Sequence, residues 1–282
     1  MLKTLKCDFG RIIVNRAFLA AITVTAVLCF STQIYFDASN GREYSVFEAL
    51  CSFDRGFMAE KYQFYPPVII KQTLLGYSSI AMPITASFPF VFSFVTERNS
   101  TNMRLSVLRS GRRKYYLSKF FSALISGGLC TMLGVMIFGV FAFALFPSTQ
   151  SPETISGILP DGVFMTLMGK ALSAFVYGMT SVLTAFFLCS FCANPYIILC
   201  VPFLLKFILE TLLSHIQTNA AAAGDYGVYD RTRPFFPNSA SLLFSMEVNK
   251  TFFEVLVVNL LFAAAVFAGF VLIMEKRADR GS

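Results

Sequence analysis

The chain has 282 residues, of which 56% are hydrophobic and 14% are charged, and its formal net charge is +7. Soluble domains usually carry about a quarter charged residues, so this composition indicates an integral membrane protein of one domain. A basic chain can bind nucleic acid, but here the Lys and Arg residues cluster beside apolar segments and form no continuous soluble face. A nucleic-acid partner is therefore not expected.

Six apolar segments are long enough to cross a bilayer, which takes about 20 mostly apolar residues in a helix. They are residues 17–36, 74–95, 117–146, 163–191, 196–216 and 252–274. In lipid, the backbone polar groups of such segments must be bonded internally, and the alternating pattern of a membrane barrel is absent. The sequence therefore predicts an all-α, polytopic membrane protein whose single transmembrane domain covers residues 1–282.

Residues 1–16 place apolar side chains at helical spacing among basic ones. The apolar positions are Leu2, Leu5, Phe9, Ile12 and Ile13. This pattern is typical of a helix that lies in the membrane interface with its basic residues toward anionic headgroups. A plain topological anchor is the alternative.

The Lys and Arg residues indicate the orientation, because cytoplasmic loops of membrane proteins are enriched in them. They concentrate in residues 1–16, in the connection 97–116 and after residue 274, and these regions fall on one side of a six-helix arrangement. Both termini are therefore expected in the cytoplasm, and residues 37–73 and 217–251 in external loops. The expected location is the cell membrane, that is, the plasma or inner membrane.

The first external loop contains a helix signal of its own. Ser45-x-x-Glu48 fits a capping box, in which each of the two side chains bonds the backbone N–H of the other residue. An apolar stripe at helical spacing is formed by Val46, Leu50, Phe53 and Phe57. We predict a short amphipathic helix here, on the outer surface of the protein.

The sequence lacks the motifs of an enzyme. It has one histidine, His215, and no Walker, G-x-S-x-G or H-E-x-x-H motif. Only Cys51 of the seven cysteines falls in an external loop, and the C-x-x-C at Cys189 and Cys192 has no second pair or histidine nearby to complete a zinc site. No metal or cofactor is expected on this chain, so any ATP-driven work must be done by another subunit.

One connection breaks the apolar pattern with the sequence TERNSTNMRLSVLRSGRRKYYLSK, residues 96–119. An acid and a base, Glu97-Arg98, are followed by an amphipathic segment and by a predicted turn at Ser110-Gly111. A basic cluster and two tyrosines then open the next apolar segment at the membrane interface. A loop that only fixed the topology would need a few charges and no apolar residues between them.

This order of residues resembles the corresponding region of ABC-2-type permeases, the membrane subunits of one class of ATP-binding-cassette exporters. In that family a Glu closes the second helix, a short coupling helix follows, and a segment like P/S-x-R-x-x-Y-x-x-x-K opens the third helix. The residues that fill those places here are Ser110, Arg112 or Arg113, Tyr115 or Tyr116, and Lys119. Six helices, cytoplasmic ends and an N-terminal interfacial helix are similar to the family as well, and residues 235–244 resemble the re-entrant piece before its last helix.

The resemblance implies a transporter subunit with defined partners. Two permease chains, identical or homologous, would sit on two ATPase subunits that bind ATP and Mg²⁺, and would export a peptide, a drug or a lipid-like substrate. The residues expected to couple to the ATPase are Glu97, Arg98, Arg104, Leu105 and Arg109. The residues expected to hold phosphates of membrane lipid are Arg112, Arg113 and Lys114.

The substrate pathway would follow the second and fifth helices, where Pro83, Pro89 and Pro202 distort the helix geometry. The fifth helix also carries Lys206 and Glu210, four residues apart, and charges at that depth in a membrane need partners. These two residues either pair with each other on one helix face or line the pathway.

Two other classes of protein stay open on the sequence alone. An ion-coupled secondary transporter or a channel would need no ATPase, and a transporter of that kind binds its ions at broken helices. A non-transporting sensor or scaffold would show no substrate-dependent turnover. An ATPase subunit bound to residues 97–116 would distinguish the permease from both.

Overall fold

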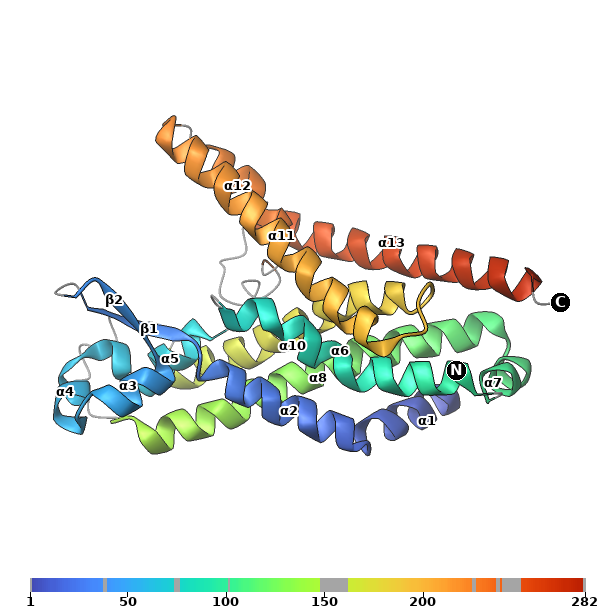
Figure 1. The fold of residues 1–282 in the computed structure, drawn as a ribbon, viewed down its shortest axis with the longest axis horizontal. Helices are drawn as coiled ribbons and strands as arrows, with labels where there is room; N and C mark the ends of the chain where they lie inside the picture. Colours follow the sequence, from blue (N-terminus) through green and yellow to red (C-terminus); the bar gives the residue numbers. More distant parts are fainter. Residues whose placement is uncertain are drawn as a thin grey trace.

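The computed structural model describes residues 2–37, 40–73, 77–100, 102–147, 162–224, 227–236, 239 and 250–280. Its long helices are α2 (Arg16–Cys29), α6 (Tyr77–Asn99), α8 (Arg112–Leu145), α10 (Gly162–Leu188), α11 (Pro195–Ala222) and α13 (Lys250–Arg280). α2, α6, α8 and α10 pack alongside one another, and α11 and α13 lie over one side of this bundle against α6 and α10 (Figure 1).

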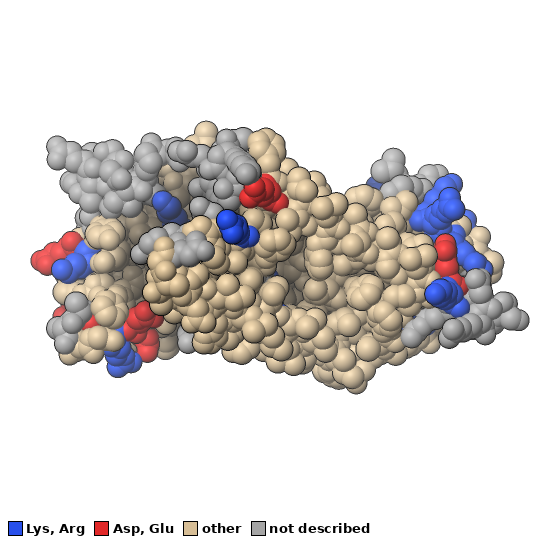
Figure 2. All heavy atoms as spheres, turned by 90° about the horizontal axis from the view of Figure 1, so that it is seen from above, with Lys and Arg blue, Asp and Glu red and all other residues tan. Residues whose placement is uncertain are grey.

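Five helices are long and apolar enough to cross a membrane, namely α6, α8, α10, α11 and α13. α1 (Leu2–Ile13) and α2 form a pair bent by 60°, which makes a sixth candidate if the pair is counted as one span. Figure 2 shows a wide zone with few charged side chains between more charged ends, as a bilayer requires. The protein is therefore a membrane-embedded, polytopic α-helical protein.

The predicted helix 17–36 is wrong at its C-terminal end. α2 stops at Cys29, and residues 33–37 form β1 (Gln33–Asp37), which pairs antiparallel with β2 (Arg42–Ser45). The run Ile34-Tyr35-Phe36 is apolar and therefore extends the hydropathy segment, but β-branched and aromatic side chains also suit a strand. Average hydropathy therefore does not distinguish a helix from a strand at these residues.

The boundaries of the connections that were predicted to be cytoplasmic and external also shift. Residues 97–99 belong to the last turn of α6, and residues 112–116 to the start of α8, so the connection predicted at 97–116 contains mostly helix. α11 continues to Ala222, and α12 (Gly227–Thr232) and η2 (Arg233–Phe235) occupy part of the segment predicted as an external loop at 217–251.

The capping box predicted at Ser45 and Glu48 is confirmed. The Glu48 backbone N–H donates to Ser45 Oγ at 3.3 Å, and the Ser45 N–H donates to Glu48 Oε2 at 2.9 Å. The Ser45 hydroxyl also donates to Glu48 Oε2, at 3.1 Å, and the bonds from the Ser45 N–H and hydroxyl, followed by one from Arg42, lower the pKa of the Glu48 carboxyl. The resulting helix is α3 (Val46–Ser52), as predicted.

The apolar stripe that starts in α3 does not continue as one surface helix. The chain breaks at Phe53 and resumes as α4 (Arg55–Glu60), η1 (Tyr62–Phe64) and α5 (Pro66–Gln72). Phe53 and Phe57 stack at 4.9 Å and contact Tyr35 of the hairpin edge-on. These short elements and the β1–β2 hairpin therefore form a packed cap at one end of the bundle, with the stripe turned inward.

α8 and α10 approach each other at Gly127 and Gly178. A Cβ on Gly178 would overlap the Gly127 carbonyl group and the Thr131 hydroxyl. Thr131 Oγ1 also donates across the interface to the Ala174 carbonyl oxygen at 2.7 Å. Small residues at such a crossing let two helix backbones come close, which is how helices pack in membranes without a hydrophobic driving force.

The two ends of the bundle differ. α1, α7 (Asn102–Ser110) and the C-terminal end of α13 lie at one end, called the α7 end here, and the β1–β2 hairpin with α3 and α4 lies at the other (Figure 1). The three Lys- and Arg-rich regions of the sequence therefore share the α7 end.

Candidate functional site

α7 lies between α6 and α8 at its end of the bundle and has two distinct faces. Met103 and Val107 pack against the buried core. Leu105, Leu108 and Arg109 lie on the opposite face, at the spacing that groups residues on one side of a helix. Leu105 is 50% exposed and Leu108 is 81% exposed. α7 thus presents apolar and basic side chains outward from the end of the bundle.

Gly111 makes the turn between α7 and α8. Its φ of 81° lies in the left-handed region, which glycine adopts without a steric penalty, so the predicted turn is confirmed. α8 then begins with three exposed basic residues, Arg112, Arg113 and Lys114. Cations at a helix N-terminus oppose the helix dipole, so an external anion would stabilise this group.

A buried charge cluster joins α1, α6 and α8 beneath α7. Lys119 Nζ donates to Asp8 Oδ1 at 2.7 Å and to Glu97 Oε2 at 2.6 Å. The Tyr115 hydroxyl donates to Glu97 Oε1 at 2.9 Å, and the Ser118 hydroxyl donates to Asp8 Oδ2 at 2.7 Å. All five residues are buried, so each charge depends on these partners.

The exposed Arg11 completes the charge balance of this cluster. Its guanidinium lies 3.7 Å from Glu97 Oε2, so two cations face the two carboxylates. Sequence reasoning missed Asp8. A signal was present, because Asp8 is an acid between Leu5 and Ile12 on the apolar face of an otherwise basic helix.

Arg98 connects the end of α6 to the turn between α10 and α11. Its Nη1 donates to the carbonyl oxygens of Cys189 and Cys192 at 2.6 and 2.7 Å. The last carbonyls of a helix have no partner within the helix, and a guanidinium also suits the negative end of the helix dipole. The C-x-x-C pair therefore contributes its backbone to this contact, and both thiols are free.

The predicted coupling residues fall into two groups in the structure. Leu105 and Arg109 are exposed on α7. Glu97 is only 3% exposed, and Arg98 is partly buried and donates to the carbonyls of Cys189 and Cys192, so both side chains are engaged in contacts within the bundle. For Arg104 the structure describes the backbone, which lies in α7.

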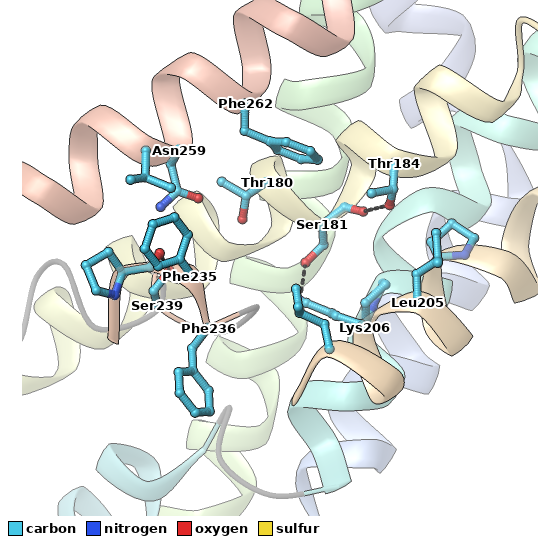
Figure 3. Close-up of a pocket in the computed structure, with 15 residues that line it drawn as sticks. Thr180, Ser181, Thr184, Leu205, Lys206, Phe235, Phe236, Ser239, Asn259 and Phe262 are labelled. Atoms are coloured by element: carbon cyan, nitrogen blue, oxygen red, sulfur yellow. Dashed lines mark hydrogen bonds between the residues drawn. The ribbon is translucent and has the colours of Figure 1, made fainter. Parts of the chain in front are cut away.

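A cavity of about 350 Å³ lies between α10, α11, α13 and the segment around η2. Its walls are mostly apolar, with Phe235, Phe236 and Phe262 facing Leu205 across the space (Figure 3). The polar side chains that line it are Thr180, Ser181, Thr184, Lys206, Ser239 and Asn259. Such a mixture of apolar walls and a few polar groups is typical of ligand sites.

Lys206 forms its hydrogen bonds to α10 and not along its own helix. Its Nζ donates to the Tyr177 hydroxyl and, at 3.2 Å, to Ser181 Oγ. Among the described residues, which include both partners, no ion pair joins Lys206 to Glu210. Glu210 lines a separate hollow together with His215. Lys206 and Glu210 therefore form no direct ion pair, although they interact electrostatically, and Lys206 lines the cavity.

Pro83 helps to position Lys206 through a chain of contacts. Proline has no N–H, so Pro83 leaves the carbonyl of Ser79, four residues earlier in α6, without a helical hydrogen bond. The Tyr177 hydroxyl donates to this carbonyl oxygen at 2.5 Å and accepts from Lys206. A helix defect in α6 thus fixes a tyrosine of α10, which in turn holds the lysine of α11.

The two predicted pathway prolines have different positions. Pro202 lines the cavity, whereas Pro89 is buried away from it. The carbonyl that Pro89 frees, that of Thr85, accepts from the Cys130 thiol with an S···O distance of 3.7 Å. Pro89 therefore belongs to the contact between α6 and α8.

The sequence matches no protein-family model and no curated protein. In the part of the chain that the structure describes, no three His, Cys, Asp or Glu side chains gather as metal ligands would. The predicted re-entrant piece at 235–244 is described only at residues 235, 236 and 239, and its other residues lie outside the described ones.

Proposed function

We propose that the chain is the membrane-spanning permease subunit of an ABC transporter of the ABC-2 type, and that a separate ATPase subunit binds to α7. The outward face of α7 is the observation that carries this proposal. Leu105 and Leu108 project from the end of the bundle beside Arg109. Exposed apolar side chains grouped with charges are typical of a surface that a partner protein covers.

The contacts beneath α7 support a coupling role. Lys119 holds α1 against α6 and α8, and Arg98 holds α6 against the turn between α10 and α11. A force on α7 would therefore reach the ends of several helices at once. In this proposal Glu97 and Arg98 position the docking surface, and Leu105 and Arg109 contact the ATPase, which would bind ATP and Mg²⁺.

The remaining partners follow from the same arrangement. Arg112, Arg113 and Lys114 at the start of α8 would meet the phosphates of membrane lipid. α11 and α13 expose long apolar faces, against which a second permease chain, identical or homologous, would pack. The bent α1–α2 pair would be the first of six spans, both termini would lie in the cytoplasm, and the complex would export a peptide, drug or lipid-like substrate across the cell membrane.

The test is co-purification of an ATP-binding partner. The tagged full-length chain is extracted from its own membranes in mild detergent and photolabelled with an azido-ATP analogue in the presence of Mg²⁺. We expect a labelled partner polypeptide with the native chain, and its loss from the Leu105→Glu, Leu108→Glu double variant, because two new acids would face the partner's apolar contact.

The matched control places the same two charges on exposed apolar residues at the other end of the bundle. Phe36 and Phe47 are 57% and 63% exposed there, so Phe36→Glu, Phe47→Glu should retain the labelled partner. The proposal fails if the native chain brings no labelled partner or if the α7 variant keeps it.

A second candidate function is an ion-coupled carrier or a channel. The cavity favours it, since a site between α10, α11 and α13 can serve transport without an ATPase. A native chain that is well folded, lacks a labelled partner and still transports in vesicles would support this candidate.

A further inference from the structure

We propose that the cavity between α10, α11 and α13 binds an amphipathic anion, with its anionic head group at Lys206 and its apolar body against the phenylalanines. The binding itself does not depend on an ATPase. Only the interpretation of this ligand as transported cargo rests on the proposed function.

The head-group site is the ammonium of Lys206. An ammonium has three N–H groups, and the two acceptors described here are the hydroxyls of Tyr177 and Ser181. Both acceptors are neutral, so they satisfy hydrogen bonds without balancing the charge. The Tyr177 ring, whose centroid lies 3.8 Å from the ammonium, and Glu210, which acts on it electrostatically from beyond ion-pair distance, stabilise this charge in part. An anion in the cavity would supply a counter-charge in direct contact and the third acceptor.

The apolar walls favour a ligand with a hydrocarbon body over a free inorganic anion. Phe235, Phe236 and Phe262 form one wall, and Leu205 stands on another (Figure 3). The cavity of about 350 Å³ corresponds to about twelve groups of water size at roughly 30 Å³ each. A carboxylate or phosphate head with a chain of about ten carbons would fill it.

The position of the head group relative to the walls gives the site a direction. Lys206 bonds Ser181 on α10, whereas Phe262 and Asn259 come from α13 on the other side of the space (Figure 3). A ligand with its charge at Lys206 would therefore extend its body toward α13 and η2. A neutral ligand of the same shape would leave the ammonium without its counter-charge and should bind more weakly.

The test uses the absence of tryptophan from the chain, since an introduced indole then reports on its own surroundings. Phe262→Trp places an indole on the cavity wall, and Phe47→Trp places one at the hairpin end as a reference for partition into detergent. The purified full-length protein is titrated at about pH 8 with ω-bromoundecanoic acid, whose bromine quenches indole fluorescence on contact. Its methyl ester, which carries no charge, is titrated in parallel.

We expect the acid to quench Phe262→Trp saturably, with a half-quenching concentration at least about ten-fold below that of the ester. Adding Lys206→Met should abolish the difference between acid and ester. Adding Lys170→Met, which changes a lysine of α10 outside the cavity, should leave it intact. Phe47→Trp should show only the quenching that detergent partition produces.

Four results would each overturn the proposal: equal quenching by acid and ester, an acid curve unchanged by Lys206→Met, equal quenching at both indoles, or displacement of the acid by inorganic phosphate. The last would show that the head group alone suffices. If Lys206→Met is not recovered as a monodisperse protein, the comparison of acid and ester on the chain with its native lysine decides.

The double variant Leu105→Glu, Leu108→Glu separates this proposal from the docking of an ATPase. In the Phe262→Trp background it should bind the acid like the parent protein. Loss of the labelled ATPase with intact acid binding would leave the cavity proposal standing. A retained ATPase in the native chain, with no binding of the acid, would overturn the cavity proposal and leave the proposed function standing.

Discussion

Lys119→Met should destabilise the protein strongly, because the lysine is the buried counter-charge of two carboxylates. Its Nζ lies 2.7 Å from Asp8 and 2.6 Å from Glu97, and the three side chains are only 5%, 9% and 2% exposed. Removing one member of a buried ion pair costs about 3–5 kcal/mol, since the other member stays charged without a partner. At roughly 2–4 °C per kcal/mol, this corresponds to a fall in Tm of about 6–20 °C.

The assay is the fraction of purified protein that stays monodisperse in size-exclusion chromatography after heating in detergent. Lys114→Met is the matched control, because Lys114 lies in the first turns of the same helix and is exposed. Adding Asp8→Asn to Lys119→Met should recover part of the lost stability, because Arg11 still faces Glu97 and Asp8 is the carboxylate that loses its cation. The reasoning is refuted if Lys119→Met melts within about 2 °C of the control.

Two further predictions concern contacts between helices and use the same melting assay. Arg98→Lys should lower the Tm by an amount that reflects loss of one charge-assisted hydrogen bond, about 1.5–3 kcal/mol, because Arg98 reaches both carbonyls with Nη1 and the lysine side chain ends one atom sooner. Arg113→Lys should change little, and equal effects of the two would contradict this. Gly178→Ala should cost about 1–3 kcal/mol, because its methyl would meet the backbone of Gly127, which no rotamer change can relieve. Gly56→Ala, which would meet no atom within 4 Å, is its control, and a Tm that is the same for both would rule out the close approach of α8 and α10.

Signals that lie within a few residues of each other predicted local structure correctly. The capping box at Ser45 and Glu48 and the turn at Gly111 both depend on neighbouring residues, and both are present. A long apolar run is also formed by neighbouring residues, and such runs located the five candidate spans. Hydropathy failed at residues 33–37, where the same apolar side chains are compatible with a strand.

Contacts between distant segments were not predictable from one sequence. Lys206 and Glu210 are four residues apart, which suggested an ion pair on one helix face. The lysine instead bonds Tyr177, whose hydroxyl donates to the Ser79 carbonyl oxygen in a third helix, where Pro83 cannot supply the helical N–H. Similarly, the motif at residues 96–119 predicted that Glu97 is exposed and contacts a partner. Its burial follows from the pairing with Lys119, which only the packing of α6 against α8 produces.

The pairing of Asp8 with Lys119 has a consequence for the order in which the protein is made. The two residues are 111 positions apart in the chain, so α1 leaves the ribosome long before its counter-charge has been synthesised. During that interval α2 and α6 are synthesised while the lysine that pairs with both Asp8 and Glu97 is still missing. α1 can therefore complete its contacts with the bundle only after translation has passed residue 119, although it is the first helix of the chain to be synthesised.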